Sequence, residues 1–254
     1  MSLESAILPD DLSPLAAAII VFSSFFTSAL TASFGLGGGL ALLAVMGALM
    51  PPAAVIPVHG VAQLGSNASR LILQWPSVVW PIVLYFAAGS LVGAAVGARL
   101  FVEMPEALLQ GLIGAFVLLT VFGPKPKGFA PGAKTYVATG AASGLVSMFV
   151  GATGPIAAAM VSVAGLDRLK TVATHAGAMA TQHLLKAVAF GLVGFAYADW
   201  AFILILIVAA GFLGAAAGTR LLRHMPEEKF RRGFTMVLAF FGCYLIGAAV
   251  LSLI

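Results

Sequence analysis

The chain has 254 residues, of which 61% are hydrophobic and only 9% charged, and its formal net charge is +4. A soluble domain carries roughly 25% charged residues, so this composition excludes a soluble globular protein and predicts an integral membrane protein with several helical spans. No basic cluster with interleaved aromatic residues is present, which argues against nucleic-acid binding. The single cysteine, Cys243, excludes an intramolecular disulfide bond, and its apolar neighbours predict that it is buried.

After a short acidic tail that lacks the basic start of a signal peptide, the hydropathy pattern predicts two sets of five apolar segments. The linker at 124–133, rich in Gly, Pro and Lys, divides the chain into a first membrane repeat at 1–123 and a second at 134–254. One segment in each set is too short for a hydrocarbon core of about 30 Å, so it is expected to be a half-helix. The first set covers 13–33, 38–50 (the short one), 53–74, 77–100 and 106–123; the second covers 134–149, 154–165 (the short one), 168–195, 199–221 and 227–253.

Each half-helix follows a break in the apolar sequence. The first break is the glycine run Gly35–Gly39, in which each glycine costs roughly 1 kcal/mol relative to Ala in a helix interior. Glycines allow sharp turns and leave backbone N–H groups free to face a ligand. In lipid, such backbone persists only where protein buries it or where it lines a wet cavity. The second break, Gly151–Pro155, lies 116 residues later.

The two sets are copies of one another. At an offset of 116 residues, His59 aligns with His175 and Arg70 with Lys186, and Gly35 and Gly38 align with glycines of the second break. At an offset of 121, a pattern G-x-x-x-G-x-R-L-x-x-x-M-P-E recurs from Gly93 and from Gly214. Small residues at this spacing let helices pack closely, within one chain or between two. The repeat predicts an internal duplication.

Charge suggests how the copies are oriented. The loop around 99–106 has a net charge of −1, whereas the equivalent loop around 220–232 has +3. Loops rich in Lys and Arg stay in the cytoplasm, so the two loops are expected on opposite sides of the membrane. We therefore expect inverted repeats, each a re-entrant helical hairpin plus three spanning helices, with a cytoplasmic linker and both termini outside. Ten full spans, and parallel repeats, are the alternatives.

Polar residues form a stripe along one helix of each copy. In 53–74 the stripe is His59, Gln63, Asn67 and Arg70, which fall within about 80° on a helical wheel. Such stripes in spanning helices face the bundle interior, and their ionisable members are functional candidates. Arg70 has the alternative of snorkelling to headgroups near the segment end. The matching stripe in 168–195 is His175, Gln182, His183 and Lys186.

Every carboxylate lies near a predicted segment end, so the core combines cations and amides without an acid. A buried Arg or Lys without a counter-ion is costly, and a bound anion is its natural partner. The start of each half-helix adds a positive dipole end. Broken helices in inverted repeats commonly form the midplane sites of secondary transporters. The candidate substrate-binding residues are Gly37, Gly38, Gly39, His59, Gln63, Asn67, Arg70, Thr153, Gly154, His175, Gln182, His183 and Lys186.

Two copies of a glycine-broken helix, each followed by a His-bearing helix and the G-x-x-x-G-x-R-L pattern, resemble the TauE/SafE family of sulfite exporters over roughly 15–253. The resemblance is clearest at Gly35, Gly37, Gly38 and Gly39. It implies export of sulfite, sulfoacetate or a related organosulfonate across a prokaryotic inner membrane. The second copy departs from the glycine pattern at Thr153 and Pro155, so the two breaks need not contribute equally.

We therefore predict a secondary transporter that works by alternating access, with a small anion and membrane lipid as its partners. Proton coupling is compatible with the sequence and would run through histidine, whose pKa is ordinarily near 6.5. A homodimer is also compatible with it. A passive anion channel and an uptake permease remain alternatives. An enzyme is disfavoured, because no paired buried acids and no metal-ligand spacing occur, and we expect neither a cofactor nor a metal.

Overall fold

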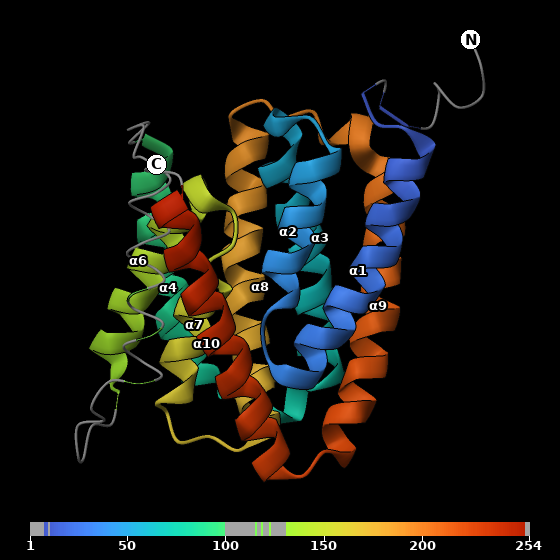
Figure 1. Ribbon diagram of the computed structural model, residues 1–254. Helices are drawn as coiled ribbons and strands as arrows, with labels where there is room; N and C mark the ends of the chain where they lie inside the picture. Colours follow the sequence, from blue (N-terminus) through green and yellow to red (C-terminus); the bar gives the residue numbers. More distant parts are fainter. Residues whose placement is uncertain are drawn as a thin grey trace.

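The structure is a computed structural model that describes residues 8–9, 11–99, 115, 118, 122 and 131–251. All regular structure in these residues is helical (Figure 1), which confirms the all-α prediction for this part of the chain. Short 3₁₀ turns lie at Trp75–Ser77 and Tyr197–Trp200. The helices are α1 (Pro14–Phe34), α2 (Gly38–Leu49), α3 (Pro52–Leu73), α4 (Trp80–Arg99), α6 (Ala133–Val150), α7 (Gly154–Ser162), α8 (Arg168–Leu192), α9 (Ala201–His224) and α10 (Glu227–Leu251).

Some expectations fall outside the described residues. The predicted span 106–123 is described only at three positions, and most of the acidic tail and the linker residues 124–130 are not described. The charge of the loop around 99–106 is likewise outside the described side chains. The orientation argument therefore remains a prediction.

The first break forms as expected, and its glycines have distinct tasks. Gly35, with φ of 85°, ends α1, and Gly37, with φ of 104°, precedes α2. Both conformations are left-handed, where a side chain would be strained. Gly38 instead allows α2 to approach α1 closely, since an added β-carbon would lie 1.8 Å from the carbonyl oxygen of Thr27. The Gly38 N–H donates to the hydroxyl of Thr31 at 3.0 Å, which ties the start of α2 to the last turn of α1.

The second break is built differently. Gly151 ends α6 with φ of 77°, and α7 begins at Gly154 with Pro155 in its first turn. Proline suits this place because it has no N–H to leave unpaired. α7 has 9 residues and ends at Ser162, so it is shorter than the predicted segment 154–165.

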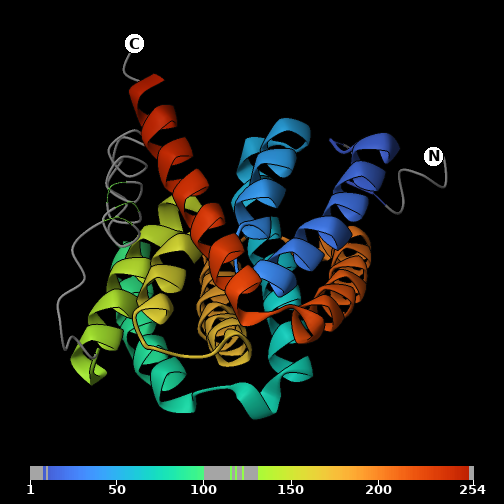
Figure 2. The ribbon, with the colours of Figure 1, turned by 60° about the horizontal axis from the view of Figure 1, so that its bottom comes forward.

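The copies pack against each other in a reciprocal pattern. α3 and α8 lie at the centre, with α4 and α6 on one side and α1 and α9 on the other (Figures 1 and 2). If α1 to α4 correspond to α6 to α9, the α1–α9 contact is the counterpart of the α4–α6 contact. Both are the most extensive helix pairs in the described chain.

Glycines of the repeated pattern make these two contacts possible. A β-carbon at Gly93 would lie 2.0 Å from the carbonyl oxygen of Ala141, and one at Gly214 would lie 2.0 Å from that of Phe25. Ala141 and Phe25 are themselves 116 residues apart. The small-residue faces therefore pack helices within one chain. The sequence alone had left open whether they pack helices within one chain or between two.

Four described helices are long and apolar enough to cross a membrane: α1, α4, α9 (with the preceding 3₁₀ turn) and α10. α1 has 21 residues, roughly 31 Å of helix, so it reaches the length of a full span, which the expectation of a re-entrant hairpin did not anticipate. α3 and α8 are long as well, but their polar stripes lower their hydropathy.

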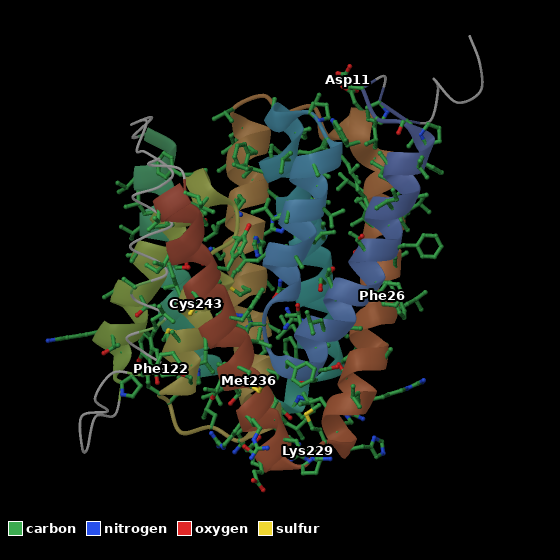
Figure 3. All side chains as sticks on the ribbon, in the orientation of Figure 1. Asp11, Phe26, Phe122, Lys229, Met236 and Cys243 are labelled. Carbon is green, nitrogen blue, oxygen red and sulfur yellow. The ribbon has the colours of Figure 1, made fainter. Side chains whose placement is uncertain are left out.

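Apolar side chains cover the outside of the bundle, among them Phe26 on α1 and Met236 on α10 (Figure 3). Cys243 is exposed on α10, so the prediction that it is buried is wrong. In a membrane helix the lipid-facing side is as apolar as the packed side, and composition around Cys243 cannot distinguish the two.

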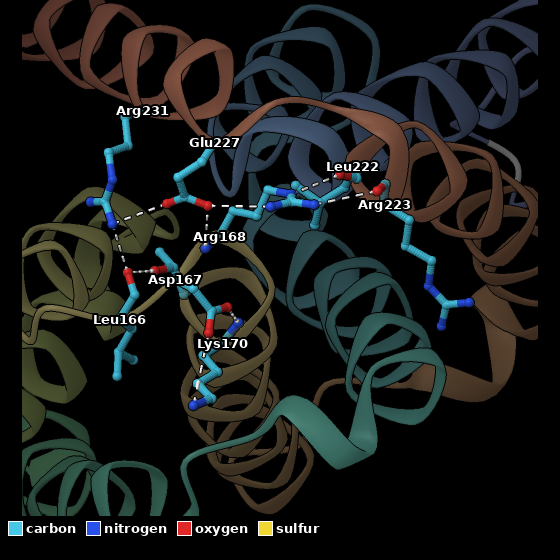
Figure 4. Close-up of polar contacts among 9 residues, drawn as sticks. Leu166, Asp167, Arg168, Lys170, Leu222, Arg223, Glu227 and Arg231 are labelled. Atoms are coloured by element: carbon cyan, nitrogen blue, oxygen red, sulfur yellow. Dashed lines mark hydrogen bonds and ion pairs between the residues drawn. The ribbon is translucent and has the colours of Figure 1, made fainter.

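One end of the bundle is positively charged. The N-terminal ends of α6, α8 and α10 and the C-terminal end of α9 lie together at the lower end in Figure 1, and Figure 3 shows Lys229 there and Asp11 at the opposite end. Arg168 joins these elements: its guanidinium lies 3.4 Å from Glu227 and donates to the carbonyl oxygen of Leu222 at 3.3 Å (Figure 4). Arg231 also contacts Glu227, at 3.0 Å. Glu227 is the first residue of α10, where the predicted segment 227–253 also begins.

Candidate functional site

A small cavity lies where the two breaks meet the central helices α3 and α8. Its volume is about 30 Å³, whereas one water needs about 10–15 Å³, so it has room for a few heavy atoms. The backbone at both breaks borders it. The lining residues are Thr31, Leu36, Gly37, Gly39, Leu40, His59, Gln63, Asn67, Arg70, Ala152, Gly154, Pro155, His175, Met179 and His183.

Arg70 is the cation of this cavity. It is 0% exposed, which excludes snorkelling to headgroups. One of its nitrogens, Nη2, donates to Oδ1 of Asn67, whose own amide donates to the Gln63 carbonyl oxygen at 2.7 Å. Among the described residues, Nε and Nη1 of Arg70 have no hydrogen-bond partner, although both are buried. A buried guanidinium with two unpaired donor nitrogens is a strong binding point for an oxyanion.

His59 and His175 hold equivalent positions at the two half-helices. Nε2 of His59 lies 2.9 Å from the carbonyl oxygen of Gly39, and Nε2 of His175 lies 3.3 Å from that of Gly154. Each ring is thus fixed to the first turn of a half-helix, α2 or α7. The rings of His59 and His183 are edge-to-face, with centroids 6.3 Å apart. In all three histidines Nδ1 is buried without a partner.

Gln182 and Thr153 belong to a separate polar network. The Gln182 amide donates to the Thr153 hydroxyl, and the Ser143 hydroxyl on α6 donates to Oε1 of Gln182 at 2.7 Å. Neither Gln182 nor Thr153 lines the cavity. These hydrogen bonds hold the second break between α6 and α8, so Gln182 and Thr153 support the backbone of the break.

Lys186 also points to the second break. It is 0% exposed, and its Nζ donates to the carbonyl oxygen of Gly151, which ends α6. It does not line the cavity. Although Lys186 and Arg70 are aligned in the repeat, Arg70 lines the cavity and Lys186 does not. Gly38, whose N–H donates to Thr31, is likewise outside the lining.

Sequence reasoning missed several lining residues, namely Thr31, Leu36, Leu40, Ala152, Pro155 and Met179. Two of them had a usable signal at the offset of 116, because Met179 is the counterpart of Gln63 and Pro155 is the counterpart of Gly39. Leucines such as Leu36 and Leu40 had none, since apolar residues are the background of a membrane helix.

The charge pattern matches the expectation. Within the described residues, the buried basic side chains are Arg70, Lys186 and three histidines; Tyr136 is also buried, and no Asp or Glu is. Among the described residues, the ion pairs lie at the lower, charged end of the bundle. Among the described residues, the buried guanidinium of Arg70 therefore has no carboxylate partner.

Comparisons with known proteins agree with the resemblance. The family model described as "Sulfite exporter TauE/SafE" matches residues 20–245, which is nearly the whole chain. Searches of curated proteins and of solved structures return no match. The matched region contains both breaks and both central helices, and the chain therefore belongs to the TauE/SafE family of sulfite exporters, which are multi-pass membrane transporters.

Proposed function

We propose that this protein is a secondary transporter that exports a small sulfur-containing anion, sulfite or an organosulfonate such as sulfoacetate, by alternating access around one central site. The observation that carries the proposal is the convergence of both glycine breaks on a cavity that contains a buried, partly unpaired Arg70. Family membership supports the sulfur anion. The volume of about 30 Å³ favours an anion as small as sulfite in this conformation.

The physical reason for anion binding is electrostatic. Arg70 has lost its water and gains no carboxylate among the described residues. An anion would accept charge-assisted hydrogen bonds at an edge of the guanidinium where Nε or Nη1 has no partner among the described residues. The N-terminal ends of α2 and α7 also face the cavity through Gly39 and Gly154, and their dipoles add positive potential.

Alternating access would follow from inverted repeats. In Figure 1 the α1–α2 hairpin enters the bundle from the upper end, whereas the α6–α7 hairpin enters from the lower end. The reciprocal packing of α1 on α9 and of α4 on α6 supports a pseudo-twofold relation between the copies. Rocking of such copies around a fixed site is the usual mechanism of transporters built this way.

We further propose that the charged lower end faces the cytoplasm of a prokaryote, with both termini outside the inner membrane. The support is the concentration of Lys and Arg at the ends of α6, α8, α9 and α10. Export then moves the anion from the lower to the upper end in Figure 1. Export is driven by the membrane potential, a proton gradient or both.

The test is flux of radiolabelled sulfite in proteoliposomes that contain the purified protein. We expect saturable, gradient-driven sulfite flux that Arg70→Gln abolishes while the variant still elutes as a folded species. Unitary currents in a planar bilayer, at rates far above carrier turnover, would indicate a channel instead. Absence of sulfite or sulfonate flux under every gradient would overturn the proposal.

A further inference from the structure

The residues that line the cavity carry two kinds of unsatisfied group. Among the described residues, Nε and Nη1 of Arg70 are donors without acceptors. Nδ1 of His59, of His175 and of His183 has no partner in the same part of the chain. All four residues line the cavity. A ligand that only accepts hydrogen bonds would satisfy Arg70 but not a ring nitrogen that carries no proton.

The backbone contacts fix the role of two of these rings. The carbonyl oxygens of Gly39 and Gly154 can only accept, so Nε2 of His59 and of His175 carries the proton in each bond. A neutral imidazole has one N–H, and Nδ1 is then a bare lone pair. A second proton on either ring would add positive charge beside Arg70 and Lys186, where no carboxylate is buried among the described residues. The free ring nitrogens of these two histidines are therefore acceptors.

We propose that the cavity selects the singly protonated form of its oxyanion, which for sulfite is hydrogen sulfite. The charged oxygens of the ligand accept from Arg70, and its proton is donated to Nδ1 of a histidine. A fully deprotonated dianion would place oxygen lone pairs against imidazole lone pairs. A sulfonate has the same single charge as hydrogen sulfite but no proton to donate, so it leaves the ring nitrogen unpaired.

This inference rests on the proposed function and adds a consequence for energetics. The proton travels on the anion, so one negative charge moves for each sulfite and no protein group needs to carry a proton across the membrane. The titratable groups that face the cavity come from α3 and α8 alone: Arg70 and the three histidines line it, and Lys186 is buried behind them. α1, α2, α7 and the two breaks contribute Thr31, backbone and apolar side chains.

The test compares sulfite with methanesulfonate, which stays a monoanion without an ionisable proton, by titration calorimetry on the full chain in detergent at pH values from 6 to 9. We expect the apparent affinity for total sulfite to fall with rising pH in step with the hydrogen sulfite fraction. We expect methanesulfonate to bind about tenfold or more weakly, with an affinity that does not change with pH. Sulfite binding that is constant over this range, or a parallel pH dependence for both anions, would overturn the inference.

Variants separate recognition of the charged oxygens by Arg70 from recognition of the ligand's proton by a histidine. Arg70→Lys should weaken both anions by a similar factor, because both offer charged oxygens. The histidines are replaced one at a time, as His59→Asn, His175→Asn and His183→Asn. We expect at least one of these variants to lower the preference for sulfite over methanesulfonate at pH 6 by about fivefold or more. If the ratio of sulfite affinity to methanesulfonate affinity is unchanged in all three variants, the proposed proton acceptor is refuted. Failure of the proposed function looks different: neither anion binds or is transported at any pH.

Discussion

Gly154 provides a direct steric test of the cavity. It is the first residue of α7 and lines the cavity, and its φ does not lie in the left-handed region. A β-carbon added there would meet no atom within 4 Å. The backbone therefore tolerates a methyl group, and the open space beside it is the space where the anion is expected.

The expected effects on stability and on transport have opposite signs. Gly154→Ala removes backbone freedom from the unfolded chain, which stabilises a protein by about 0.4–1 kcal/mol when the native conformation suits alanine. The same methyl group takes a large share of a cavity of about 30 Å³. One methylene of misfit in a binding pocket is worth about 1–3 kcal/mol, or roughly 10- to 200-fold. We expect Gly154→Ala to fold at least as well as the wild type and to lose sulfite flux by that factor.

Two matched substitutions make the result interpretable. Gly247→Ala on α10 also meets no atom within 4 Å, and it should leave flux unchanged because it lies away from the cavity. Gly38→Ala should destabilise the protein severely, since its β-carbon would lie 1.8 Å from the Thr27 carbonyl oxygen. The assays are sulfite flux in proteoliposomes and thermal unfolding in detergent. Wild-type flux through a well-folded Gly154→Ala variant would refute the placement of the anion at α7.

Three further substitutions test other parts of the structure. Arg70→Lys keeps the charge but loses the planar pair of free donors, so sulfite affinity measured by calorimetry should fall about tenfold or more. Lys186→Met should weaken sulfite binding much less than Arg70→Gln does, because Nζ binds the Gly151 carbonyl oxygen; equal losses would show that Lys186 contacts the anion. Gly214→Ala should lower thermal stability by roughly 1–3 kcal/mol, since α9 must move away from the Phe25 carbonyl oxygen; an unchanged melting temperature would contradict the packing of α9 on α1.

Helix positions were largely predictable because hydropathy and Gly or Pro signals agree in this chain. The predicted segment 38–50 corresponds to α2 at Gly38–Leu49, and 53–74 corresponds to α3 at Pro52–Leu73. Sequence was less informative where both sides of a helix are apolar. It gave no reason for Cys243 to face outward, and α7 ends earlier than the apolar run that contains it.

The site was predictable to the extent that helical periodicity controls it. The stripe on α3 faces the cavity as a unit, because residues three and four apart share one side of a helix. On α8 the stripe divides, because His175 and His183 line the cavity and the other two do not. Gln182 contacts Ser143 and Thr153, and Lys186 contacts Gly151, so both serve the neighbouring break. A polar side chain on such a helix can reach either the cavity or the backbone of a neighbouring helix. The outcome depends on how far the helices are shifted along each other, and one sequence does not contain that information.

The inequality of the two copies follows from local backbone chemistry. At the first break, the N–H of Gly35 donates to the carbonyl oxygen of Thr31, and the Thr31 hydroxyl accepts from Gly38. That break is satisfied by its own helix pair, so Arg70 is left free to face the cavity. At the second break, Ser147 stands at the position equivalent to Thr31 and donates to the carbonyl oxygen of Gly144, while Lys186 donates to the carbonyl oxygen of Gly151. Under the proposed function, the two aligned cations therefore have different roles: Arg70 binds the anion, and Lys186 holds the second break.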